Sequence, residues 1–211
     1  MKRVIFVVLS LVLALTPALA SNVPPTQVAV ANLWTTLGSN PLPSYTPLDL
    51  TGGAFTLPAM TPFTGNYATG VFSYDPAGHL VFVYAVSLDN APPNPANADV
   101  QKISTGDWAD NITVNAKMFD ATGTDIAASG INRLNGVITM YFQNPLVKVG
   151  QQSYVLLLYT NATEYTEDTI GIQDGAGTTV NGFVPLAPTP EPASLLLLGI
   201  GMVGLGALRK K

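Results

Sequence analysis

Three acidic side chains in the second half of the chain are a first candidate for chemistry. Glu164, Glu167 and Asp168 lie within the segment TEYTEDT, and paired carboxylates are the groups that hydrolyse glycosidic bonds. In a glycosidase the two carboxylates flank the scissile bond, whereas these three follow one another within a short polar stretch. The pattern therefore favours a solvated loop, and a secreted glycosidase is the weakest of three functional hypotheses.

His79 is the single histidine of the chain and the residue through which a Ser-His-Asp triad would have to act. It follows the turn Asp75-Pro-Ala-Gly78 and opens an apolar run, a place where an exposed histidine is common. No G-x-S-x-G motif accompanies it. The sequence therefore predicts no catalytic residue.

Trp108 lies between two acidic residues, Asp107 and Asp110, in the segment STGDWADN. An exposed tryptophan can stack on a sugar ring while carboxylates bind the hydroxyl groups, which would make a carbohydrate-binding module. The alternative is a tryptophan folded into the end of the core, and the large apolar area of this side chain favours it.

Asp120 to Asp125 has part of the oxygen pattern of a calcium loop. Threonine fills the third and fifth positions and Asp125 stands where an EF-hand needs glycine, so the segment is interpreted as a hairpin turn. We expect no cofactor and no metal site, with a structural Ca²⁺ left open because acidic residues are in excess.

The charges of the middle segment, 21–187, exclude nucleic acid as a partner. The chain has nine basic and thirteen acidic residues, but five of the basic ones lie in the terminal segments. The middle segment keeps four basic against twelve acidic residues, a net charge of −8. Phosphate binding needs clustered lysine and arginine, which this segment lacks. The chain also has no cysteine, so a packed core must stabilise it without disulfides.

The middle segment reads as a series of β-strands separated by turns. Runs over 80–88, 137–142 and 154–160 are rich in β-branched and aromatic residues, and 111–119 alternates between apolar and polar. No stretch keeps a helical period. We therefore predict an all-β ectodomain over 21–187, an antiparallel, jelly-roll-like β-sandwich of seven to ten strands, with 80–88 and 155–158 at the centres of its two sheets.

The first twenty residues have the three parts of a secretory signal peptide. Lys2 and Arg3 precede a twelve-residue apolar run, and Ala18-Leu19-Ala20 forms an A-x-A cleavage site. We therefore expect export by the Sec machinery and removal of residues 1–20 by signal peptidase.

The last 24 residues have three parts: a proline-rich segment that favours an extended backbone, an apolar span and a basic end. Prolines flank Glu191 in Pro190-Glu191-Pro192, and residues 193–208 contain no charge. A helix over 193–208 is long enough to cross a membrane if the terminal side chains of Arg209, Lys210 and Lys211 reach the cytoplasmic surface. The ectodomain would then lie on the periplasmic side of the inner membrane.

These three parts, in this order at the C-terminus, resemble the PEP-CTERM sorting signal. The resemblance covers 188–211, and the threonine before the motif, Thr189, is a mild departure because the family often has valine there. It implies a Gram-negative surface protein processed by an exosortase, an integral-membrane enzyme that cleaves near the motif, and a link to exopolysaccharide. The segments GHLVFVYAVSLDN, GVITMYFQNPLVKVGQQSYVLLLYTNATEY and GIQDGAGTTVNGFVPLAPTPEP are similar, less specifically, to all-β ectodomains of that family.

The first hypothesis is therefore a non-enzymatic exported protein of the cell surface or biofilm matrix. An exosortase would sort and cleave it through Pro190, Glu191 and Pro192, with exopolysaccharide as a further partner. The alternative is a carbohydrate-binding, adhesin-like module that uses Trp108, Asp107 and Asp110.

Overall fold

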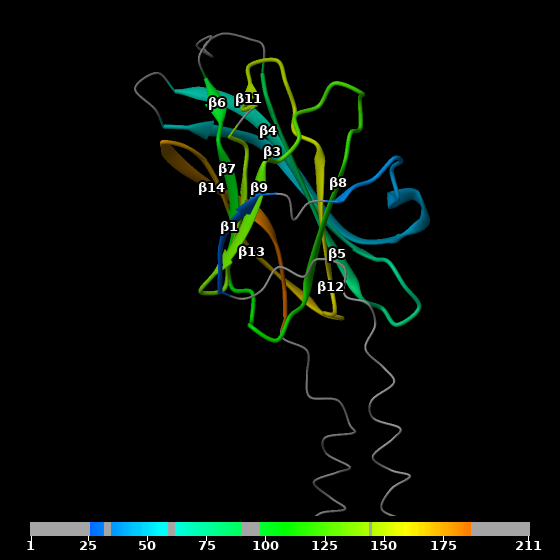
Figure 1. Cartoon of the computed structure of the whole chain (residues 1–211). Coiled ribbons are helices and arrows are strands. Elements are labelled where there is room, and N and C mark those ends of the chain that lie inside the picture. Colours follow the sequence, from blue (N-terminus) through cyan, green and yellow to red (C-terminus); the bar gives the residue numbers. More distant parts are fainter. Residues whose placement is uncertain (1–25, 32–34, 59–61, 90–97, 144, 187–211) are drawn as a thin grey trace, which may run out of the picture.

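The described part of the chain folds into two β-sheets that pack against each other (Figure 1). The computed structural model describes residues 26–31, 35–58, 62–89, 98–143 and 145–186. The predicted signal peptide, 1–20, and the predicted sorting segment, 188–211, lie outside these residues. Fourteen strands and one short 3-10 helix form within the described residues, so the prediction of an all-β fold is confirmed.

The first sheet, called sheet I here, has six strands, of which β8, β12 and β5 lie on the right in Figure 1. Its order is β2 (Thr35–Thr36), β8 (Val114–Phe119), β12 (Val155–Thr160), β5 (Leu80–Leu88), β4 (Phe63–Ser73) and β3 (Thr46–Leu57).

The second sheet, sheet II, also has six strands and lies on the left. A pair of two-residue strands, β6 and β11, stands beside the two large sheets. The order in sheet II is β1 (Thr26–Ala31), β9 (Gly130–Leu134), β10 (Val137–Tyr141), β7 (Lys102–Thr105), β13 (Tyr165–Asp174) and β14 (Ala176–Pro185), and the separate pair joins β6 (Asp99–Val100) to β11 (Val147–Lys148).

The prediction of purely antiparallel sheets is wrong at one edge of sheet I. There β2 pairs with β8 in parallel, with Thr35 opposite Lys117 and Thr36 opposite Met118. The chain enters β2 from the other sheet, so no tight hairpin turn imposes the antiparallel direction on this pair. The finer comparison with a jelly roll stays a prediction.

One hydrophobic core fills the space between the sheets. Phe82 and Leu158 of sheet I and Ile131 and Ile172 of sheet II belong to the same buried cluster, each with 0% exposed surface. Burial of apolar surface stabilises a fold by about 25 cal/mol per Å², and no disulfide contributes because the chain has no cysteine.

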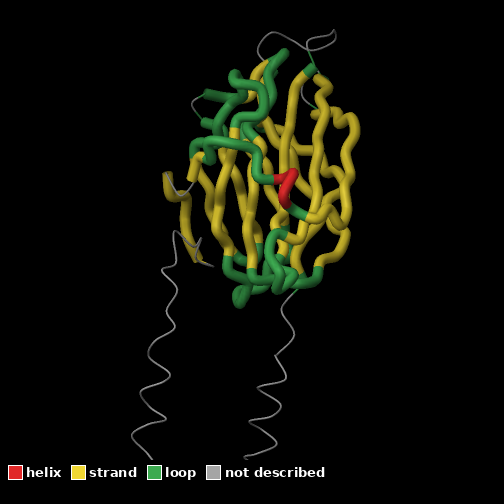
Figure 2. Tube along the Cα trace, turned by 90° about the vertical axis from the view of Figure 1, so that its right-hand side faces the viewer, coloured by secondary structure: helices red, strands yellow, loops and turns green. Residues whose placement is uncertain are grey.

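The central strands β5 and β12 are apolar on both faces because both faces are covered. Leu80 and Phe82 point into the core, whereas Val81 and Val83 belong to a second cluster on the outer face of sheet I. The segment 37–45, which contains the 3-10 helix Leu42–Ser44, packs over that outer face (Figure 2). The two strands are neighbours in sheet I, so the prediction that they form the centres of two different sheets is wrong.

The predicted ends of the strands agree best with the structure where the apolar pattern of the sequence is strongest. The run over 80–88 is β5 itself, and β8 alternates as predicted between buried Val114 and half-buried Asn115. The first half of β3 had no such signal, because Pro47 and Gly52 interrupt it and its side chains are largely exposed. The prediction of seven to ten strands is too low, because it did not count β3, the two-residue strands and the short β7. The described residues form fourteen strands.

Replacement of Phe82 by alanine tests the core. Phe82 has no exposed surface and its ring meets Trp108 edge-on, with ring centroids 5.3 Å apart. We expect Phe82→Ala to lower the free energy of unfolding by about 3–5 kcal/mol in urea titrations, because it removes apolar contacts and leaves a cavity. Leu50→Ala is the control, since Leu50 is 64% exposed and its loss should cost at most about 0.5 kcal/mol. Equal losses would contradict the position of the core.

Candidate functional site

Three stretches that are distant in the sequence meet at one end of the sandwich. Residues 87–89 contain the end of β5, residues 122–125 belong to the connection from β8 to β9, and residues 150–152 precede β12. Backbone hydrogen bonds join them: the Leu88 amide donates to Gln151 at 3.0 Å, and the Ile126 amide donates to Gln152 at 2.8 Å. The backbone of the site is therefore fixed by main-chain pairing.

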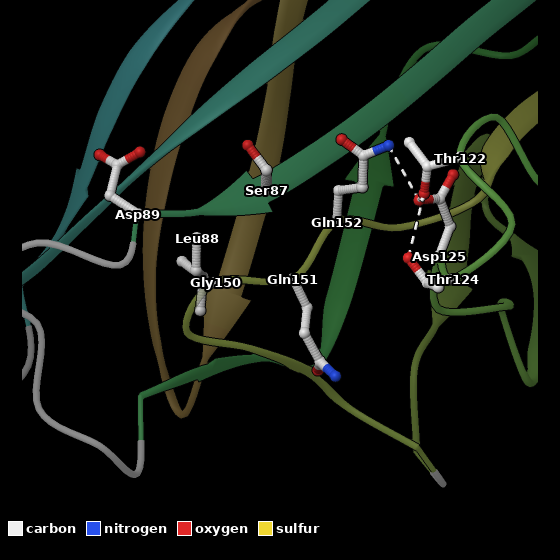
Figure 3. Close-up of a pocket in the computed structure, with 9 residues that line it drawn as sticks. All are labelled: Ser87, Leu88, Asp89, Thr122, Thr124, Asp125, Gly150, Gln151 and Gln152. Atoms are coloured by element: carbon white, nitrogen blue, oxygen red, sulfur yellow. Dashed lines mark hydrogen bonds between the residues drawn. The ribbon is translucent and has the colours of Figure 1, made fainter.

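A groove runs between these stretches and onto the outer face of sheet I. The hollow at the end of the sheet has a volume of about 550 Å³, and an adjoining hollow of about 270 Å³ shares Ser87 and Gln152 with it. Ala68 and Ala85 line the second hollow, together with the larger residues Tyr67, Val86 and Val155. Figure 3 shows Asp89 on one side of Ser87, and Gln152 followed by Asp125 on the other. We call the two hollows together the polar groove.

Hydrogen bonds position a carboxylate on each side of the polar groove. Asp89 accepts a hydrogen bond from the Asn66 amide at 2.7 Å. Asp125 accepts one from the Gln152 amide at 2.9 Å, and also bonds the Thr122 hydroxyl and the Ala121 amide. Partial burial raises the pKa of Asp125, but these hydrogen bonds outweigh it and lower the pKa overall. Among the described residues that line the groove there is no lysine or arginine, so its electrostatic character is acidic.

The segment from Asp120 to Asp125 is not the predicted hairpin turn. It joins β8 of sheet I to β9 of sheet II, so the flanking strands do not pair with each other. Asp120 Oδ1 accepts hydrogen bonds from the backbone amides of Thr122 and Gly123, at 3.1 and 2.7 Å. The loop thus satisfies this carboxylate internally. Within the described ranges, no three histidine, aspartate or glutamate side chains converge in a way that could hold a metal ion.

The polar groove lies at the end of the sandwich opposite to the end from which the chain continues toward its C-terminus. β14 ends at Pro185, and the Leu186 amide donates to the Glu164 carbonyl close to the start of β5. Leu88 is at the other end of β5 and lines the groove. The groove and Leu186 therefore lie at opposite ends of the sandwich.

Trp108 is in the core, which does not fit the alternative prediction of a sugar-binding platform. Its side chain is 1% exposed, its indole nitrogen donates to Thr105 Oγ1 at 3.3 Å, and its ring packs on Phe82. Asp107 adopts a φ of 57°, a left-handed conformation that aspartate tolerates, and bends the chain so that the next ring turns inward. A ring in this position presents no face to a ligand.

Arg133 is the feature of this region that the sequence did not reveal. It is fully buried, and its guanidinium donates hydrogen bonds to the carbonyl oxygens of Ile112 at 2.5 Å, Trp108 at 3.2 Å and Ala109. Burial lowers the pKa of Arg133, and the charge of Asp110 opposes that shift. The buried cation therefore donates to three carbonyl groups of an irregular segment, and the charge of Asp110 favours its protonated form.

His79 is the edge of a turn, as predicted, and its partner is local. Its Nδ1 is 2.6 Å from Asp75 Oδ2, and its backbone amide donates to Asp75 Oδ1 at 3.0 Å. Burial raises the pKa of Asp75, but the hydrogen bonds and the charge of His79 lower it overall. Both contacts close the turn that leads into β5, which gives the pair a structural role.

The acidic cluster near Glu164 is not one loop. β13 begins at Tyr165, so Glu167 and Asp168 lie on this strand, opposite Phe183 and Gly182 of β14. The sequence-based prediction missed this because the polar residues of an exposed edge hairpin resemble those of a loop. Glu164 and Glu167 are both exposed and do not line the polar groove.

A pair of carboxylates that no motif indicated is formed by Asp99 of β6 and Asp174 at the end of β13. Burial, a hydrogen bond with Asp99 and the charge of Asp99 raise the pKa of Asp174 to about 6. The Gln101 amide donates to Asp174 Oδ1 at 2.8 Å and acts in the opposite direction. The two acids therefore disfavour simultaneous ionisation.

Comparison with known proteins identifies the C-terminal end of the chain. A family model described as the PEP-CTERM protein-sorting motif matches residues 188–211. A search of curated proteins and a search of solved structures each found no significant match. Within the stretches that the structure describes, no helix has the length and apolar character needed to cross a membrane.

The matched motif defines the chain as an exported protein that is sorted at a membrane. More specifically, the chain carries the PEP-CTERM sorting motif, which implies processing by an exosortase, so the resemblance noted in the sequence is confirmed. The motif residues themselves, Pro190, Glu191 and Pro192, the basic end 209–211 and the cleavage-site residues Ala18 and Ala20 lie outside the described residues.

Replacement of Arg133 tests the buried cation. Arg133→Met keeps much of the apolar volume but leaves the carbonyl oxygens of Trp108 and Ile112 without their donor, and Ala109 keeps only the Ile112 amide, so we expect the free energy of unfolding to fall by about 3 kcal/mol. Lys148→Met removes the same charge from an exposed position and should change stability by about 0.5 kcal/mol at most. Denaturant titration of both variants checks this, and a folded Arg133→Met of native stability would contradict it.

The carboxylate pair predicts a pH dependence of stability. The pKa of Asp174 is raised from 3.8 to about 6 by folding, so its ionisation destabilises the native state as pH rises from about 4 to 6, and the loss is complete above that range. Asp174→Asn removes this ionisation. We expect its Tm to match that of the unaltered protein near pH 4 and to exceed it near pH 7.

Glu167→Gln is the control for this prediction, because it removes an exposed carboxylate from the same strand. Thermal unfolding followed by circular dichroism at several pH values compares the three proteins. A difference between Asp174→Asn and the unaltered protein that does not change with pH would show that the pair does not titrate as described.

Proposed function

We propose that the chain is a non-enzymatic protein of the cell surface or extracellular matrix. It is exported, held at the inner membrane as a precursor with its ectodomain in the periplasm, and cleaved by an exosortase near Pro190-Glu191-Pro192. The observation that carries this proposal is the sorting motif matched over 188–211. The link to exopolysaccharide and to the biofilm matrix is part of the proposal and follows from the same resemblance.

The physical character of the C-terminal sequence supports this order of events. Prolines at 188, 190 and 192 favour an extended backbone that an enzyme cleft can bind without unwinding a helix. The uncharged stretch 193–208 suits a membrane span, and the three terminal basic residues favour the cytoplasmic side. Together they would hold the scissile region just outside the lipid.

The side chains of the ectodomain support a role without catalysis. The contacts of His79 with Asp75 close a turn. Glu164 and Glu167 lie at the start of an exposed hairpin and not on opposite walls of the polar groove. A scaffold that presents a surface uses such residues to end strands and shape turns.

The masses of the precursor and of the surface form test the proposal. We expect surface material from the producing cells to yield a protein that begins at Ser21 and lacks the residues after about Pro192. Replacement of Pro190, Glu191 and Pro192 by alanine should leave the uncleaved chain in the membrane fraction, because the extended tag is lost. Intact-mass spectrometry of the surface and membrane fractions measures both forms.

Leu186→Ala, four residues before the motif, is the control and should be processed normally. Surface protein that still contains Lys211 would contradict exosortase processing. Unchanged processing of the triple alanine variant would show that the motif residues are not what the enzyme recognises.

A further inference from the structure

We propose that the polar groove binds a neutral, polyhydroxylated chain, that is, an oligosaccharide or a segment of polysaccharide. The groove is lined at its wider end by Ser87, Asp89, Thr122, Thr124, Asp125 and Gln152 (Figure 3). This inference gives the proposed surface protein a ligand and in that sense rests on the proposed function. The site is distinct from Trp108, which is buried at the other end of the sandwich.

The electrostatics of the lining select the ligand class. Carboxylates stand on both sides of the groove and no basic residue lines it, so phosphate, sulfate and strongly anionic polymers are repelled. Leu88 is the one large aliphatic residue in the wider part, whereas Tyr67, Val86 and Val155 line the narrower part beside Ala68 and Ala85. An apolar ligand would therefore gain little buried area in the wider part.

The hydrogen-bonding groups match vicinal hydroxyls. The side-chain amide nitrogen of Gln152 donates a hydrogen bond to Asp125. The amide oxygen of Gln152 can therefore accept a hydrogen bond from a ligand. Ser87 and Thr124 add hydroxyl groups that both donate and accept. Sugar units carry hydroxyl groups, which both donate and accept, on most of their ring carbons, so a wall of amide, hydroxyl and carboxylate groups can satisfy them as they lose water.

The shape of the groove favours a chain over a single compact molecule. The two hollows share Ser87 and Gln152, and they extend from the edge of the sandwich onto the face of sheet I. The wider part alone, at about 550 Å³, falls in the usual range of ligand sites, about 300–1,000 Å³. An elongated site with one end open can bind internal units of a polymer.

The backbone around the groove is already organised for binding. The Ser153 amide donates to Val86 at 2.8 Å, the Tyr154 amide donates to Ile126 at 2.8 Å, and Ser87 pairs with Gln152 in an antiparallel bridge. A site held by main-chain hydrogen bonds loses little conformational entropy when a ligand binds.

Binding of neutral oligosaccharides to the full chain in detergent tests the inference. The probes are tetramers to hexamers of cellulose, β-1,3-glucan, amylose and mannan, measured by isothermal titration calorimetry. We expect at least one to bind. We expect Ser87→Gln, which fills the point where the two hollows join, to weaken that binding at least tenfold, and Thr124→Ala on the rim to weaken it by a smaller factor.

Thr179→Gln on β14 is the matched control, because it adds the same amide to an exposed position of the other sheet. It should bind as the unaltered chain does. If Ser87→Gln fails to fold in thermal unfolding, the Thr124→Ala result decides, since this residue is exposed at the loop surface.

Three results would overturn the inference: no binding of any of the probes by the folded chain, equal binding by Ser87→Gln and the unaltered chain, or selective binding of Ca²⁺ or of a lysine-rich peptide in their place. Sorting is measured by mass in cells and groove binding by calorimetry. Normal processing without sugar binding would therefore reject the groove alone, and sugar binding without processing would reject the proposed sorting alone.

Discussion

The buried guanidinium of Arg133 is the interaction on which one end of the core depends. The segment from Trp108 to Ile112 has no strand partner for its carbonyl groups, and three of them accept hydrogen bonds from this one side chain. Because those carbonyls are satisfied, the segment can cross the end of the sandwich and place Trp108 against Phe82. The guanidinium fork suits this task better than an ammonium group, since it donates in several fixed directions.

A second constraint is that sheet I must be covered on both faces. Its central strands bury Phe82 and Leu158 toward sheet II, and Val83 and Leu157 toward the segment that contains the 3-10 helix. The cover does not extend over the whole outer face. Beyond the covering segment, the short side chains of Ala68 and Ala85 leave a hollow on the outer face of sheet I, and the polar groove begins there. The groove is thus a consequence of how far the covering segment reaches.

The sequence predicted the strands with strong local patterns and missed what depends on distant contacts. Periodicity located β5 and β8, but it could not reveal that β5 and β12 share one sheet, because a continuous apolar run does not say which layer covers it. The site was harder to predict. Ser87, Asp125 and Gln152 are ordinary polar residues near strand ends, and only the pairing of three distant stretches brings them together. The sorting motif was predictable because its meaning lies in contiguous residues.

The order in which strands pair has a consequence for the timing of export. The first two strands have no early partners: β1 pairs with β9, and β2 pairs with β8, roughly a hundred residues later. Likewise β7 needs β13 on one side. Such non-local pairing slows folding, since long loops must close before the contacts form. In a chain that crosses a membrane from its N-terminal end, β1 and β2 must therefore stay unpaired until residues 114–134 have also crossed, whereas β3, β4 and β5 can pair with one another earlier.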